Sequence, residues 1–388
     1  MTSQTETTRR IIVSTTVLRQ AMSKLAPFVE GDSVVPILEN VLATVREGNM
    51  TLFASDMQNS ATATVPVEST GDMQACWPIR DIVKLLATLR EQPVTLRMSE
   101  TEVVLEADRA EYSYKGLEHP GDFIKEPEFT PKSSFKMQIG QLRDLLRKAK
   151  DYMSNDDLRP AMTGIHWSCD PENTNPGSHQ MVATDGQKLI KLNPVIISQT
   201  AAFAAIIPRK MVTKLGVILP RKGDDVRVDI GEKLARFSWG HYSMCCRLVD
   251  EKFPNYKDAM PMGESTILRL YRADLIAAVR RAGLFANQMT QQMRLGILST
   301  RVQVHAENLD YNKFMTETLP VIEFDGEPLE IGFNAKLMLS ILQSMTTPAI
   351  EMKLHNRNRA CLFYAVNGKH TDPAAMHLLM PVMLNTYA

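Results

Sequence analysis

The chain has 388 residues, 44% hydrophobic and 23% charged, a composition typical of a folded globular protein with two or three domains. Its 44 Lys and Arg residues balance 44 Asp and Glu residues, which argues against polyanion binding over the whole surface. The polar first ten residues lack the apolar core of a signal peptide, and no run approaches the roughly 18 apolar residues of a membrane helix. We therefore expect a cytoplasmic protein with no membrane partner. The cysteines form no CxxC pair, so we expect reduced, mostly buried thiols and neither zinc nor disulfides.

Apolar residues at offsets 0, +3, +4 and +7 predict six amphipathic helices along the chain. In chain order the stripes are Leu18, Ala21, Met22, Leu25; Ile82, Leu85, Leu86, Leu89; Leu142, Leu145, Leu146, Ala149; Val212, Leu215, Gly216, Leu219; Leu275, Ala278, Val279, Ala282; and Met338, Ile341, Leu342, Met345. The fourth stripe is the weakest. The six fall into two interleaved series, so each third of the chain holds two helices.

Between the helices, alternating apolar and polar residues predict pairs of short strands around tight polar connections. Such pairs are expected at 94–107, 226–239 and 350–364. The proline-containing stretches 126–135 and 253–265 are typical of linkers. The predicted fold class is α+β, with three similar domains that each pack two helices on antiparallel sheet. Their expected boundaries are 1–130, 131–261 and 262–388.

An internal repeat supports this division. LFASDMQNS (52–60) and MVATDGQKL (181–189) share the frame Ala, hydroxyl residue, Asp, any residue, Gln, at a spacing of 129 positions. WPIRDIVKLL and IPRKMVTKLG follow them, with Pro78 and Pro208 130 positions apart. A third copy of the latter, GFNAKLMLSIL, has Asn334 in place of the proline, 126 positions after Pro208. Matches at nearly one spacing indicate a repeat architecture.

Asp185, in the second copy of the frame, has two interpretations. A hydrolase could use it as a catalytic acid together with a histidine. Alternatively it forms a turn, because Asp-Gly favours the positive backbone angles of a hairpin and Asp56 recurs at the equivalent place. The chain has no GxxxxGK[ST], GxGxxG, HExxH or GxSxG motif, and its eight histidines are scattered. We therefore expect no catalytic residue, cofactor or metal, and the hydrolase is the less favoured alternative.

The charge is separated along the chain. The helical windows 14–26, 78–90, 138–150, 208–221, 269–282 and 334–345 hold 18 basic and three acidic residues, leaving 26 basic and 41 acidic residues elsewhere. Basic residues avoid the apolar stripes, as Arg80 and Lys84 or Arg143 and Arg147 illustrate. Helices sharing one side of the sheet would make a positive surface suited to a phosphate backbone. The alternative is that each is an ordinary solvated helix face.

Seven segments in order carry a family resemblance. They are VPILENVLATV, DDLRPAMTGIHW, ATDGQKLIKL, IPRKMVTKL, RLVDEKFPNYKDAMP, LEIGFNAKLMLSIL and the ending LLMPVML. Over essentially its full length, the chain resembles the bacterial DNA polymerase III beta subunit, the sliding-clamp family. Any one segment would be weak, but seven on a three-fold repeat are specific.

The resemblance implies a non-catalytic processivity factor. Two copies would join head to tail into a closed ring of six domains. The helices would line a hole around double-stranded DNA, which the ring would contact without sequence preference. Its expected location is the nucleoid. The DNA-facing residues it implies are Arg19, Lys24, Arg80, Lys84, Arg143, Arg147, Lys148, Arg209, Lys210, Lys214, Arg280 and Lys336.

The resemblance also implies an apolar pocket for short peptide motifs. Its partners would be the DNA polymerase III alpha subunit, the clamp loader, other polymerases and repair proteins. Carried over position by position, the pocket would use Met162, Thr184, Gly186, Gln187, Lys188, Leu189, Pro254, Leu378, Met380, Pro381, Val382 and Met383. Flexible methionines would let it accept several partners, whereas without the resemblance ordinary core packing would explain them.

Departures from the family pattern concern partner and DNA contacts. Gln187 and Lys188 replace a usual His-Arg pair, Asp258 stands where a basic residue is common, and Met383 where arginine is often found. Near the DNA, the departures are Asp32 for an arginine and Pro160 and Ala161 for aromatic residues. Three possibilities therefore stay open: a main replicative clamp, a divergent second copy, or a three-repeat scaffold that does not touch DNA.

Overall fold

A computed structural model describes residues 9–29, 31, 34–99, 101–170, 179–199 and 201–384; Asp32 lies outside these ranges. Within them the six predicted helices are confirmed. They are α1 (Thr15–Leu25), α2 (Ile79–Thr88), α3 (Ile139–Lys150), α4 (Arg209–Ile218), α5 (Arg272–Phe285) and α6 (Ala335–Ser344). The predicted stripes are buried, except that Leu85 and Leu89 are half-buried; Leu89 lies just beyond α2, which ends at Thr88.

Side chains just before the helices explain where two of them begin. Ser14 accepts a hydrogen bond from the Val17 N–H at the start of α1, and Asn334 accepts one from the Leu337 N–H, at 3.1 Å, at the start of α6. Such caps satisfy amide groups that have no partner inside the helix. Pro78 takes the capping position of α2 without a side-chain bond. Asn334 can therefore replace the repeat's proline without loss of the helix start.

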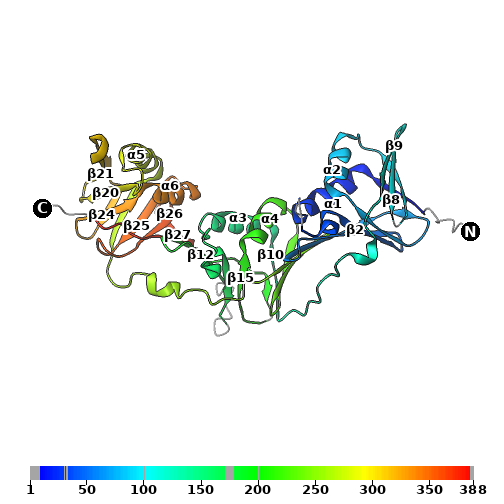
Figure 1. The fold of residues 1–388 in the computed structure, drawn as a ribbon. Helices are drawn as coiled ribbons and strands as arrows, with labels where there is room; N and C mark the ends of the chain where they lie inside the picture. The colour runs from blue at the N-terminus through cyan, green and yellow to red at the C-terminus, as the bar shows by residue number, and fades with distance from the viewer. Residues whose placement is uncertain are drawn as a thin grey trace, which may run out of the picture. The chain divides into compact units, whose positions relative to one another are not determined.

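The contacts of the chain divide into two compact units. The first unit comprises 1–142, 197–201 and 214–248, and the second comprises 143–196, 202–213 and 249–388. In the first, α1 packs on α2 (Figure 1) and on β3 (Asn49–Ser55) and β4 (Asn59–Pro66); in the second, α5 packs on α6 and on β21 (Arg301–Asn308) and β22 (Lys313–Pro320).

The first unit contains two antiparallel sheets. The nine-stranded sheet has the order β14 (Ser198–Gln199), β10 (Ser133–Gln138), β16 (Asp225–Ile230), β17 (Leu234–Trp239), β18 (Tyr242–Arg247), β4 (Asn59–Pro66), β3 (Asn49–Ser55), β2 (Val41–Arg46), β6 (Met73–Trp77). The five-stranded sheet has the order β5 (Glu68–Ser69), β1 (Arg9–Ser14), β7 (Pro93–Met98), β8 (Glu102–Ala107), β9 (Ala110–Lys115). The strand pairs predicted at 94–107 and 226–239 are confirmed.

The second unit repeats this arrangement. Its nine-stranded sheet has the order β15 (Phe203–Pro208), β11 (Gly164–Cys169), β12 (His179–Thr184), β13 (Lys188–Leu192), β27 (His370–Leu379), β26 (Cys361–Asn367), β25 (Ala349–Leu354), β19 (Thr266–Tyr271), β23 (Glu323–Asp325). Its four-stranded sheet has the order β22 (Lys313–Pro320), β21 (Arg301–Asn308), β20 (Gln292–Ile297), β24 (Leu329–Asn334). The strand pair predicted at 350–364 is confirmed.

Each nine-stranded sheet joins strands from two different thirds of the chain. In the first unit β18 pairs with β4, placing Cys246 opposite Asn59. In the second, β13 pairs with β27, placing Leu189 opposite Leu378. Backbone hydrogen bonding therefore continues from one repeat to the next. We call these two pairings the first and second junctions.

The connecting segments and cysteines largely match expectation. Residues 126–132 are irregular, but the predicted first linker runs too far because β10 begins at Ser133. The second linker holds only the short 3₁₀ helix Tyr256–Ala259.

All five cysteines are free and buried. No helix in the described part of the chain is long and apolar enough to span a membrane.

Candidate functional site

The Asp185 carboxylate is a structural acceptor in the β12–β13 turn. Its Oδ1 accepts the backbone N–H groups of Gln187 and Lys188, both at 2.9 Å, and Gly186 takes the positive φ of 90° that closes the turn. Thr184 adds a third bond by accepting the Gly186 N–H at 3.1 Å. The turn prediction is confirmed. Within the described ranges, no group of three or more His, Cys, Asp or Glu is arranged to hold a metal.

An apolar cluster lies on the sheet beside this turn. Its buried members are Val182, Leu189, Ile206, Phe253, Ala360, Leu362, Met376 and Leu378. The pairings of β13 with β27 and of β27 with β26 place Leu189, Leu378 and Leu362 in one row. The cluster contains two of the predicted partner-site residues, Leu189 and Leu378. Leu362 could not be found from local sequence, because only strand pairing brings it to this row.

The other predicted residues of this site surround the cluster unequally. Met162 and Thr184 are buried; Gly186, Gln187 and Pro254 are exposed; Pro381 and Val382 are half-buried. Met380 is 39% exposed and Met383 81% exposed, so both methionines remain available for contact rather than serving as core. The Met380 N–H donates to the Gln187 carbonyl at 2.8 Å, which ties the C-terminal segment to the turn.

Lys188 departs from the prediction. Its side chain is only 7% exposed, its Nζ lies 3.3 Å from the Ser340 hydroxyl, and the ammonium sits 5.0 Å from the Tyr152 ring centroid. Successive residues of a strand point to opposite faces of the sheet, so Lys188 points away from the face on which Leu189 contributes to the cluster. Burial lowers the pKa of Lys188, against the opposing charges of Asp185 and Asp151. Its charge is therefore not presented to a partner.

A buried polar pair lies behind the cluster. The Tyr152 hydroxyl is 2.7 Å from His377 Nδ1. Burial, with a smaller contribution from the Lys148 charge, lowers the pKa of His377 from 6.5 to about 3. Burial also raises the pKa of Tyr152. His377 is therefore neutral and holds β27 against the end of α3, with its neighbour Leu378 in the cluster.

Lys214 is wrongly placed among the DNA-facing residues. Its Nζ lies 2.6 Å from Asp56 Oδ2, with side-chain exposures of 13% and 1%, and 4.6 Å from the Phe28 ring centroid. Burial acts to raise the pKa of Asp56, but the Lys214 and Asn59 interactions outweigh it, so the pKa is lowered. The periodicity of α4 could not reveal this pair because the aspartate comes from another repeat.

Two further predicted DNA contacts are partly used inside the protein. The Lys24 ammonium lies 3.7 Å from the Tyr242 ring centroid, and burial lowers the pKa of this lysine. Arg209 donates Nη2 to the carbonyls of Met153 and Ser154, at 2.6 and 3.1 Å. Both residues are half-buried and help to hold the helices in place.

The remaining predicted residues are mostly at the surface. Arg80, Lys84, Arg147, Lys148, Lys210, Arg280 and Lys336 are exposed, and Arg19 and Arg143 are half-buried. Arg80 also donates to the Val29 carbonyl at 3.1 Å, and Lys84 lies 3.6 Å from Asp81. Exposed cations at these sites can contact an external phosphate while their stems pack on the helix.

The chain matches three family models in sequence. They are the N-terminal domain of the DNA polymerase III beta subunit at 9–123, its central domain at 136–255 and its C-terminal domain at 257–383. The beta sliding clamp of Vibrio cholerae is 25% identical over 91% of this chain and 94% of that protein. The beta sliding clamp of Pseudomonas aeruginosa is 26% identical over 95% and 99%.

Solved structures show the same fold. The Bacillus subtilis sliding clamp superposes with a TM-score of 0.88 at 18% identity, covering 97% of this chain and all of that one. A P. aeruginosa sliding clamp bound to griselimycin gives 0.86 at 24% identity, also covering 97% of this chain and all of that one. The three-domain α+β fold expected from the sequence is thus confirmed.

Proposed function

Because the chain belongs to the DNA polymerase III beta-subunit family, the bacterial sliding clamps, we propose that it encircles duplex DNA and keeps the replicative polymerase on its template. The observation that carries this proposal is the match of all three family domains in order. The proposed domains are 1–130, 131–261 and 262–388. The protein would act without catalysis, in the cytoplasm.

We propose that two copies close the ring through sheet edges. β9 and β22 are terminal strands of their sheets, and their side chains are mostly exposed. Long open edges invite pairing with another chain. Pairing β9 of one copy with β22 of the other is a head-to-tail contact, which forms a closed dimer when the rotation permits. Light scattering should give a dimer at micromolar concentration, and a monomer alone would refute this arrangement.

DNA would be retained by topology rather than by tight binding. Exposed cations such as Arg147 and Lys148 attract every phosphate similarly, so no register is preferred and the ring can slide. After loading, the protein should stay on a nicked circular plasmid and run off once the plasmid is cut. Equal loss from circular and linear DNA would overturn the proposal and favour the scaffold alternative.

Charge reversal tests the proposed DNA-facing surface. Arg147→Glu with Lys148→Glu should reduce association with DNA, whereas Lys252→Glu, exposed immediately before the second linker, is a control of the same sign. Lys214 is excluded from such a test because its reversal would place two acids together at Asp56. Equal effects of the helix and linker variants would show that only net charge matters.

We further propose that partner peptides dock on the apolar cluster and the segment Met380–Met383. The two exposed methionines and the buried Leu189 and Leu378 offer an apolar, adaptable surface. The polymerase alpha subunit, clamp loader, other polymerases and repair proteins would compete for it. Griselimycin, which the P. aeruginosa clamp binds, should bind here as well.

Removing residues from Met380 onward should abolish griselimycin binding, measured by calorimetry, because one wall of the docking surface is lost. Unchanged affinity would refute this location. A divergent second copy with altered partners stays a candidate, since Gln187 and Met383 are exposed at this surface where the family often has basic residues.

A further inference from the structure

The C-terminal segment 380–384 is held at two separate points. The Met380 N–H donates to the Gln187 carbonyl at 2.8 Å, and the Val382 N–H donates to the Gly332 carbonyl at 2.9 Å. Gly332 lies in β24, a terminal strand of the four-stranded sheet, and forms an isolated antiparallel bridge with Val382. The segment thus adds one backbone pairing to an otherwise open edge.

Only a residue without a side chain fits at Gly332. A Cβ built there would lie 2.6 Å from the Val382 carbonyl oxygen and 2.7 Å from Leu384 Cδ2. The nearer atom belongs to the backbone, so the contact can be relieved only if the segment that carries Val382 shifts. Gly332 is not among the glycines with positive φ, so an L-residue can adopt its backbone conformation. The close approach of the C-terminal segment is therefore the reason for glycine here.

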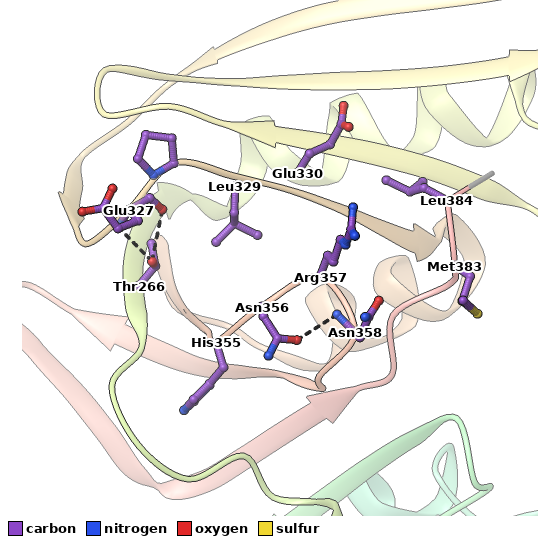
Figure 2. A pocket seen from close by; sticks show the side chains of 11 residues that line it. Thr266, Glu327, Leu329, Glu330, His355, Asn356, Arg357, Asn358, Met383 and Leu384 are labelled. Carbon is purple, nitrogen blue, oxygen red and sulfur yellow. Dashed lines mark hydrogen bonds between the residues drawn. The ribbon is translucent and has the colours of Figure 1, made fainter. Parts of the chain in front are cut away.

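The segment runs beside a cavity of about 480 Å³ on the same unit. Met383 and Leu384 border it together with Leu329, Glu330 and the loop 355–358 (Figure 2). Leu384 also borders a neighbouring cavity of about 290 Å³. Met383 is 81% exposed, and among the described residues beyond Pro381 the bond from Val382 to Gly332 is the backbone hydrogen bond that holds the segment.

We propose that Gly332 is a positioning residue for partner docking. By admitting Val382 against β24, it fixes the course of the segment that runs from Met380, bonded to the turn beside the apolar cluster, to Met383. A segment that is already ordered favours binding of a partner, because less conformational entropy of its side chains and backbone is lost when the complex forms. This inference rests on the docking surface proposed above. It attributes the fixed position of the C-terminal segment to Gly332, a residue of the four-stranded sheet, whereas Leu189 and Leu378 lie in the nine-stranded sheet.

A matched pair of alanine variants tests the inference. Gly332→Ala introduces the clash, whereas Gly296→Ala, in the adjacent strand β20, adds a Cβ whose nearest neighbour is Gln303 at an ordinary 3.8 Å. Hydrogen exchange at the Val382 amide should accelerate in Gly332→Ala alone. Calorimetric affinity for griselimycin should fall about tenfold in the same variant and stay unchanged in Gly296→Ala.

Deleting residues from Val382 onward provides a variant with β24 intact. It should lose at least as much affinity, because Met383 is removed as well, and adding Gly332→Ala to it should cause no further loss, because the contact that the alanine disturbs is already absent. Unchanged exchange or unchanged affinity in Gly332→Ala would overturn the inference. A wild-type protein that does not bind griselimycin would instead refute the docking surface, a different outcome from a loss confined to the variants.

Discussion

The turns at Asp56 and Asp185 have the same pattern of backbone hydrogen bonds but differ in the residues that surround them. Asp56 Oδ1 accepts the N–H groups of Gln58 and Asn59 at 3.0 and 2.6 Å, just as Asp185 accepts two amides of its own turn. Each turn connects the last two strands before a junction. The repeated sequence frame therefore specifies one local structure twice.

The lysine beside each turn comes from a different element. At the first junction Lys214 on α4 pairs with Asp56, whereas at the second, α6 carries Ser340 and the turn itself supplies Lys188. Each ammonium lies over an aromatic ring that follows the first helix of the repeat containing the turn. Lys214 lies over Phe28, which follows α1, and Lys188 lies over Tyr152, which follows α3. The first aspartate is sealed in an ion pair, while the second turn remains at the surface beside the apolar cluster. The same turn can thus serve stability in one place and partner docking in the other.

The largest expected effect separates the two junctions directly. Lys214→Met leaves the Asp56 carboxylate buried without its partner and should lower the free energy of unfolding of the first unit by about 3–5 kcal/mol. Urea denaturation followed by hydrogen exchange in β4 and β18 measures it. Ser340→Ala, at the matching helix position, should cost under about 1 kcal/mol, since it removes one neutral acceptor. Equal effects would remove the distinction between the junctions.

Acid should affect the second junction first. The pKa of His377 is lowered from 6.5 to about 3, so the unfolded chain binds a proton that the folded chain excludes; stability is full above pH 6.5 and falls toward pH 3. At pH 5 the expected loss is about 2 kcal/mol. The lowered pKa of Asp56 gives the first junction a contribution that persists until below about pH 4.

His377→Asn keeps an acceptor near the Tyr152 hydroxyl but does not titrate. Urea unfolding of the second unit should therefore show a flatter pH dependence between pH 7.5 and 5 in this variant, whatever its absolute stability. In the second junction His377 lies opposite Ile190, and at the matching position of the first junction Met244 lies opposite Ala61. Because methionine does not titrate, the first unit of the same protein provides the internal control. An unaltered pH dependence would exclude His377 as its origin.

The smallest effect concerns the exposed turn. Asp185→Ala removes a shared acceptor from two amides, of which that of the exposed Gln187 can bind water instead, so it should cost about 1 kcal/mol in urea denaturation and leave DNA retention intact. Asp56→Ala should cost more, because Lys214 would stay behind in the buried site without its partner. Loss of function in Asp185→Ala at normal stability would support a chemical role for this carboxylate.

Local patterns determined the elements of this protein. The apolar stripe of Leu18 to Leu25 and its five counterparts predicted every α-helix in the described ranges, and Asp-Gly predicted the turn, because periodicity and turn chemistry are properties of neighbouring residues. The resemblance supplied the family and named two residues, Leu189 and Leu378, that the structure brings together in the apolar cluster.

Tertiary structure alone decided which charges and apolar groups meet. Lys214 and Asp56 are 158 positions apart, and Tyr152 and His377 are 225 apart, so no local pattern could couple them. Pairing of β13 with β27 across the repeats placed Lys188 opposite Leu379 and Leu189 opposite Leu378, and pairing of β27 with β26 within the third repeat brought Leu362 beside Leu378. A side chain's partner depends on where the whole chain returns, and that is set by packing among distant segments rather than by the residue's own neighbours.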